Sequence, residues 1–214
     1  MTMLLTISIT YGQNFRFGFH GETGYSSFKT LTKGLSDNGG SLAYGFGLML
    51  DYKLGDHYAL STGADISYKG GSLSYLVDSL SGTSKMKLQY IEVPIGLKMK
   101  TGEIGYMTYF LNVGTALGVN IAGKGDYNVQ YTDSSWSINI SNDKLGSRVN
   151  PIAASLLISA GTEYNLSGNA SIMASLFFNN SFLDVLKDLK DNQKNVIDVG
   201  SRLNVVGINV GIFF

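Results

Sequence analysis

Seven ionisable side chains fall on the same face of the strands that this sequence predicts, and they could form a functional site. They are Arg16, His20, Asp51, Asp65, Glu92, Lys98 and Glu163. Charges removed from water are costly unless they are paired. If this face is interior, its simplest use is a plug of salt bridges and hydrogen bonds. The sharper alternative is a polar passage or a ligand site.

Catalysis is not indicated by the spacing of these residues. The chain has two histidines, His20 on a predicted strand and His57 in a predicted turn, and no Cys. It has no G-x-S-x-G motif, no His pair at metal-ligand spacing, and no phosphate loop, because the stretch 63–71 lacks a G-K-[ST] ending. We therefore expect no catalytic residue, no metal and no cofactor.

Composition narrows the class of protein. Of 214 residues only 15% are charged, below the roughly 25% of a typical soluble domain, while Gly reaches 27 and Pro only 2. The formal net charge is zero, which gives no reason to expect a nucleic-acid partner. The absence of Cys excludes disulfides and a lipoprotein anchor. No stretch approaches the ~18 apolar residues of a membrane helix.

The last segment carries the clearest pattern. Between Val199 and the terminal Phe214, large apolar residues alternate with small or mixed ones, as one apolar face of a strand requires. A free edge of this kind invites aggregation, and a closed barrel removes it by pairing the last strand with the first. Phe214 also resembles the C-terminal signal that the outer-membrane insertion machinery reads.

About eight segments show the same alternation. They cover approximately 14–26, 41–54, 58–69, 87–100, 109–120, 152–164, 169–179 and 199–214. Short and long connections alternate, as periplasmic turns and extracellular loops do. The sequence predicts an all-β, antiparallel up-and-down transmembrane β-barrel. A soluble lipocalin-like barrel is the alternative, but large apolar residues outside and small or polar ones inside favour the membrane.

Several local features lead to narrower expectations. Pro94 predicts a bulge at the barrel rim, and Glu92 is expected to pair with Lys98 or Arg16. The segment 182–189 has approximate helical spacing and could form a short amphipathic helix over the barrel mouth. An extra hairpin is expected around 135–141, where Trp136 fits local packing better than a contact with a partner. Arg202 is expected at the rim.

The first 13 residues resemble a secretory signal peptide, which leaves 14–214 as the barrel domain. The segment departs from that pattern because no Lys or Arg precedes its apolar run. The alternative is that it forms a first strand.

One hairpin resembles a known family. Residues 90–98 (Tyr-Ile-Glu-Val-Pro-Ile-Gly-Leu-Lys), a short turn and the aromatic-rich strand that follows are similar to the PorT family of outer-membrane barrels of the Bacteroidetes. The resemblance is close over 89–121 and loose elsewhere. It implies an integral outer-membrane location and an accessory role in type IX secretion.

Together these patterns predict a non-catalytic outer-membrane barrel. Six residues would form its polar lumen plug: Arg16, Asp51, Asp65, Glu92, Lys98 and Glu163. The expected partners are outer-membrane lipid, the insertion machinery, and secretion-system or other envelope proteins. The alternatives are a stand-alone structural or adhesin-like barrel with ligand-binding loops and, more weakly, a narrow pore.

Overall fold

The computed structural model describes residues 14–30, 35–77, 80–131, 137–146, 148–168, 170–187, 189–190, 196–197 and 200–214. The expected signal peptide, 1–13, and Trp136 lie outside these residues. The described part of the chain contains no helix long and apolar enough to cross a membrane.

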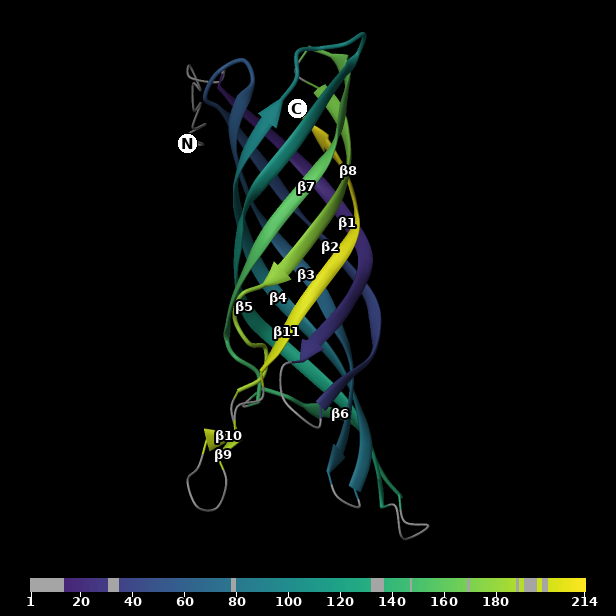
Figure 1. The fold of residues 1–214 in the computed structure, drawn as a ribbon. Helices are drawn as coiled ribbons and strands as arrows, with labels where there is room; N and C mark the ends of the chain where they lie inside the picture. Colours follow the sequence, from purple (N-terminus) through teal and green to yellow (C-terminus); the bar gives the residue numbers. More distant parts are fainter. Residues whose placement is uncertain are drawn as a thin grey trace, which may run out of the picture.

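Long antiparallel strands close into one barrel (Figure 1). They are β1 (Phe15–Thr30), β2 (Leu35–Lys53), β3 (Tyr58–Val77), β4 (Leu80–Lys100), β5 (Met107–Tyr131), β7 (Ile152–Ser167), β8 (Ala170–Ser181) and β11 (Ser201–Phe213). The first and last strands pair from Gly18↔Phe213 to Thr30↔Ser201, and β4 pairs with β5. This confirms the predicted closed, up-and-down barrel of eight strands.

Three shorter strands lie outside the ring. Within the described part of the chain, the strand β6 (Ser137–Lys144) pairs with residues 124–130 of β5 alone, which gives the extra hairpin expected around 135–141. The strands β9 (Leu189–Lys190) and β10 (Val196–Ile197) pair with each other. The strand β6 and the β9–β10 pair lie at the end of the barrel away from the C-terminus (Figure 1). The short connections 54–57 and 101–106 lie at the C-terminal end, which we assign to the periplasm because outer-membrane barrels have short periplasmic turns.

The outer face of the barrel is apolar. Ile91, Val93, Ile95 and Leu97 alternate along β4 and remain 42–46% exposed. The same alternation exposes Val206, Ile208 and Val210 on β11. Such a band suits lipid and would be unfavourable in water. The soluble, lipocalin-like alternative therefore does not fit.

Two predicted loops are strands instead. The strand segments predicted by alternation leave 27–40 and 70–84 as connecting loops. In the structure, β1 and β2 leave only 31–34 between them, and β3 and β4 leave only 78–79. Residues 35–40, 70–77, 80–88 and 123–131 of β2 to β5 continue beyond the apolar band and, with β6, form a sheet that we call the sheet extension (Figure 1). Their Gly and Ser content resembles a loop, but cross-strand pairing supplies the hydrogen bonds that a strand needs.

Apolar side chains fill the extracellular half of the lumen. The sequence predicts small or polar residues inside, so this apolar half is a difference from the prediction. Phe28, Leu88 and Tyr90 are at most 2% exposed and belong to one cluster. Two connecting segments fold over this cluster through Leu145 and Val185. The barrel is therefore closed by its own core at this end.

The helix predicted at 182–189 is wrong. Residues 182–187 form bends without a helical turn, and Leu186 forms an isolated β-bridge with Val149. The backbone N–H of Val185 donates to the Ser201 carbonyl at 2.7 Å, and the N–H of Leu186 donates to the Ser201 hydroxyl at 3.2 Å. These partners satisfy backbone groups that a helix would have paired internally. The segment nevertheless covers the barrel mouth.

The bulge predicted at Pro94 is also wrong. The pairing of β3 with β4 keeps one register from Thr62↔Ile95 to Asp65↔Glu92, and the β4–β5 register shift falls at 89–90. The Thr62 hydroxyl donates to the Pro94 carbonyl at 2.8 Å. The missing N–H is therefore accommodated in mid-strand without an inserted residue.

Candidate functional site

Five charged residues meet in the periplasmic half of the lumen, and we call them the charge cluster. They are Arg16, Asp51, Lys98, Lys100 and Glu163. Arg16 Nη1 lies 2.8 Å from Glu163 Oε2, and Lys98 Nζ lies 2.6 Å from Glu163 Oε1 and 2.8 Å from Asp51 Oδ2. Lys100 Nζ lies 3.1 Å from Glu163 Oε2. Four of the six predicted plug residues are thus brought together.

The charge cluster holds three cations and two carboxylates, and aromatic rings contact the cations. Arg16 lies 4.5 Å from the centre of the Phe213 ring, and Lys98 lies 4.5 Å from that of Phe110. A cation over an aromatic face is attracted by the ring quadrupole. Arg16 also donates to the Ser171 hydroxyl. The cluster occupies the lumen at this level with its own side chains.

The other two predicted plug residues form separate contacts farther along the lumen. Glu92 accepts from the Ser67 hydroxyl at 2.5 Å and from Lys69 Nζ at 2.6 Å. The expected pairing of Glu92 with Lys98 or Arg16 is wrong, because six residues of β4 separate Glu92 from Lys98 by roughly 20 Å. Asp65 Oδ1 lies 2.8 Å from His20 Nε2.

A small cavity lies between the charge cluster and the apolar core. It has a volume of about 80 Å³ and is lined by His20, Asp65, Asn112 and Asn209 among others. His20 Nδ1, Asn112 Oδ1 and Asn209 Oδ1 have no hydrogen-bond partner among the described residues. The volume suits two or three ordered waters, since a water occupies about 30 Å³ of the liquid. It is too small for a typical ligand pocket of at least about 300 Å³.

Parity identifies lumen residues that the sequence prediction left out. Lys100 lies two residues from Lys98 on β4, and Lys69 lies four residues from Asp65 on β3. Each therefore points to the same face of its strand as the predicted residue. Both lie at the last position of a predicted strand segment, 58–69 and 87–100, so the alternation already placed them on the inner face. Arg202, expected at the rim, is exposed and lies 3.8 Å from Asp184. His57 lies in the 54–57 connection, apart from His20.

Phe214 lies at the C-terminal end of the barrel wall. Its backbone N–H donates to the Phe17 carbonyl at 2.8 Å. Its side chain is 57% exposed, and its ring packs edge-on against Phe19 at 6.4 Å between centroids.

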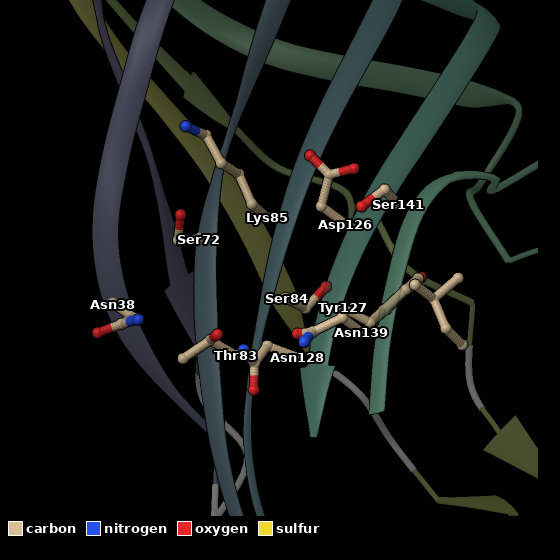
Figure 2. Close-up of a pocket in the computed structure, with 11 residues that line it drawn as sticks. Asn38, Ser72, Thr83, Ser84, Lys85, Asp126, Tyr127, Asn128, Asn139 and Ser141 are labelled. Carbon is tan, nitrogen blue, oxygen red and sulfur yellow. The ribbon is translucent and has the colours of Figure 1, made fainter. Parts of the chain in front are cut away.

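A polar pocket of about 360 Å³ lies on the sheet extension (Figure 2). Its lining side chains include Asn38, Ser72, Lys85, Asp126, Asn128 and Asn139. Lys85 is the cross-strand partner of Asp126, and Asn128 is that of Asn139, so these side chains share a face. That face is opposite to the one that buries Met86 and Leu88.

The pocket offers hydroxyl, amide, ammonium and carboxylate groups to solvent. The Asp126 carboxylate accepts from the backbone N–H of Asn142 at 2.8 Å, which fixes its orientation. Such a set can hydrogen-bond to a sugar or to polar side chains. Among the residues that the structure describes, no group of three or more His, Asp or Glu side chains is placed to hold a metal ion.

The closed barrel, its apolar outer band and its filled lumen define an integral outer-membrane β-barrel protein. Residues 11–191 match the family described as "Outer membrane protein beta-barrel domain", and the chain belongs to that family. Comparison with curated protein sequences gave no match.

Three solved structures are similar in fold. Neisserial surface protein A is 13% identical, with 92% of this chain and 97% of that chain covered and a TM-score of 0.47. Ail, the attachment invasion locus protein of Yersinia pestis, is 17% identical in its complex with the heparin analogue sucrose octasulfate, with 94% and 99% covered and a TM-score of 0.42. OprG of Pseudomonas aeruginosa is 10% identical, with 92% and 95% covered and a TM-score of 0.42.

Proposed function

We propose that this protein is a non-catalytic, non-conducting outer-membrane barrel that presents its sheet extension to a partner at the cell surface. One observation carries the proposal: the lumen is filled by the protein's own side chains, while the polar pocket on the sheet extension is open to solvent. The part of the protein available for binding is therefore outside the membrane.

Two layers in series support the non-conducting part of the proposal. The charge cluster occupies the periplasmic half of the lumen, and the apolar cluster occupies the extracellular half. Leu145 is 0% exposed and Val149 is 2% exposed, so the connection over the mouth belongs to the core. An ion would have to displace the paired charges and then cross an apolar layer, and both steps are costly.

The architecture of the sheet extension supports the binding part. Its five strands are paired by backbone hydrogen bonds, which hold the polar side chains in fixed rows. A rigid surface loses less conformational entropy on binding than a mobile loop does. The outer edge of β6 has no strand beside it among the described residues, and such an edge can pair with an extended segment of a partner.

Site-specific photocrosslinking in intact cells tests this proposal. A photoreactive amino acid at Asn128, in the pocket, should give one discrete protein adduct. The same group at Ile95, in the apolar band, should react with lipid and give no such adduct. No protein adduct from Asn128, or the same adduct from both positions, would overturn the proposal.

The second candidate is the accessory role in type IX secretion, which the resemblance at 89–121 favours. Within this segment, Glu92 bonds to Ser67 and Lys69, and Lys98 joins the charge cluster. These motif residues hold the lumen together, so the resemblance supports a shared barrel more directly than a shared task.

Deletion of the gene tests the secretion role. Cargo with a C-terminal secretion domain should accumulate in the periplasm, and complementation should restore its export. If export is unchanged, the secretion role is contradicted, while the crosslinking experiment still decides whether the sheet extension binds a partner.

A further inference from the structure

Three lysines on neighbouring strands lie directly opposite one another on the sheet extension. Lys87 of β4 pairs with Lys124 of β5, and Lys124 pairs with Lys144 of β6. Directly opposed residues share a face and have Cβ atoms about 5 Å apart, and like charges in this position are destabilising. Lys85, two residues from Lys87, adds a fourth ammonium group on the same face. We call these four residues the lysine row.

The described part of the chain does not neutralise the charges of the lysine row. All four side chains are exposed, and none has a carboxylate within 4.0 Å among the residues that the structure describes. The nearest acidic cross-strand partner, Asp126, uses one oxygen to accept from the Asn142 backbone. By contrast, Lys69, Lys98 and Lys100 in the lumen are all paired.

The row lies immediately beyond the apolar band. Along the outer face of β4, Ile91 is followed by Gln89 and then by Lys87. The Gln89 side chain donates to the Tyr68 hydroxyl at 2.9 Å, and the Tyr68 ring stacks on Tyr44 with 4.7 Å between centroids. Outward-facing tyrosines of this kind mark the membrane–water boundary. Lys87 lies only two residues beyond that boundary, at the depth of lipid headgroups.

A groove joins the aromatic boundary to the row. It has a volume of about 560 Å³, and its lining includes Leu42, Tyr44, Tyr68, Lys85, Lys87 and Lys124. One end of the groove is therefore apolar and aromatic, and the other carries positive charge. This arrangement matches a lipid whose hydrocarbon lies along the aromatic end and whose anionic headgroup lies at the lysines.

We propose that the lysine row binds the phosphate groups of phosphorylated lipid headgroups in the outer leaflet. Lysine binds phosphate as a point charge, and each lysine near an anionic membrane surface adds to the attraction. Bound phosphates would remove the repulsion among Lys87, Lys124 and Lys144. The groove would hold the adjoining part of the same lipid. This site faces the membrane and adjoins the polar pocket proposed above to bind a surface partner, because Lys85 lines both. The variant tested below replaces Lys87 and Lys124 and leaves Lys85 in place.

The test uses the full-length protein in detergent micelles and a bis-phosphorylated glucosamine lipid in mixed micelles as the probe. Binding of the wild type is compared with that of Lys87→Gln/Lys124→Gln. The matched control is Lys53→Gln/Lys187→Gln, which removes two exposed lysines outside the row. We expect about 30-fold weaker binding for the row variant and less than twofold change for the control.

Three further arms decide the source of the anion. The same lipid without its phosphates should not bind detectably, and inorganic phosphate at equal concentration should not compete. A sulfated oligosaccharide should bind more weakly than the lipid. Equal binding by the wild type and the row variant, full competition by inorganic phosphate, or tighter binding of the oligosaccharide would each overturn the proposal. Thermal unfolding without lipid verifies folding, and we expect the row variant to be no less stable than the wild type because like charges have been removed.

Discussion

Arg16 on β1 and Glu163 on β7 form an ion pair inside the barrel, with 2.8 Å between Arg16 Nη1 and Glu163 Oε2. They are 147 residues apart in the chain, and β11 and β8 lie between their strands in the barrel wall. The pair therefore crosses the lumen and depends on closure of the barrel. It also links the charge cluster to the fold, because Glu163 contacts all three cations.

Replacement of Glu163 by Ala should be strongly destabilising. Among the described residues it leaves Asp51 as the one carboxylate close to the three cations Arg16, Lys98 and Lys100. Unpaired buried charge typically costs about 3–5 kcal/mol. The free energy of unfolding in urea, measured in lipid micelles, should fall by that amount.

The control is Asp143→Ala, which removes the partner of exposed Arg148 at 2.9 Å. An exposed pair contributes about 1 kcal/mol or less. Equal losses in the two variants would contradict the buried charge cluster.

Replacement of Gly47 by Ala should disturb the His20–Asp65 contact. An added Cβ would press against the Asp65 carboxylate and lie 2.5 Å from the Ala64 carbonyl oxygen. Such overpacking typically costs about 1–3 kcal/mol of stability. Gly55→Ala is the matched control, since its Cβ would meet no atom within 4 Å, and we expect a change within about 0.5 kcal/mol. If unfolding of the two variants were indistinguishable, β2 and β3 would not approach as described.

Truncation of Leu145 to Ala should loosen the closure of the barrel mouth. Leu145 is fully buried although it lies in a connection, and large-to-small changes in a core cost about 2–5 kcal/mol. Ile138→Ala on β6, where the side chain is 43% exposed, should change stability by no more than about 0.5 kcal/mol. Unfolding of both variants by urea provides the comparison, and a smaller loss for Leu145 would argue against an apolar closure.

Alternation predicted most of the barrel because it reports which face of a strand meets lipid. It placed Val206, Ile208 and Val210 on the outer face of the last strand and Glu163 on the inner face, as the structure does. It did not predict the sheet extension, because the Gly and Ser residues there weaken the apolar signal while the pairing between strands is unaffected.

Which charged side chains pair with one another inside the lumen could not be predicted from the alternation of residues along each strand. Glu92 and Lys98 are an even number of residues apart, so the alternation places them on the same face of β4. Which side chains meet across the lumen depends on the stagger of all the strands around the barrel. That stagger places Lys69 beside Glu92 and Glu163 beside Lys98. The segment at 182–189 is a similar case, since its backbone partners come from the distant Ser201.

Single-channel conductance in planar bilayers tests the central claim most directly. The full-length protein should give no stable conductance steps, while a large porin treated in the same way conducts. The heat-dependent shift of the folded barrel in a denaturing gel verifies that enough folded protein has been inserted. Regular unitary steps from the wild-type protein would contradict a lumen closed by the charge cluster and the apolar core.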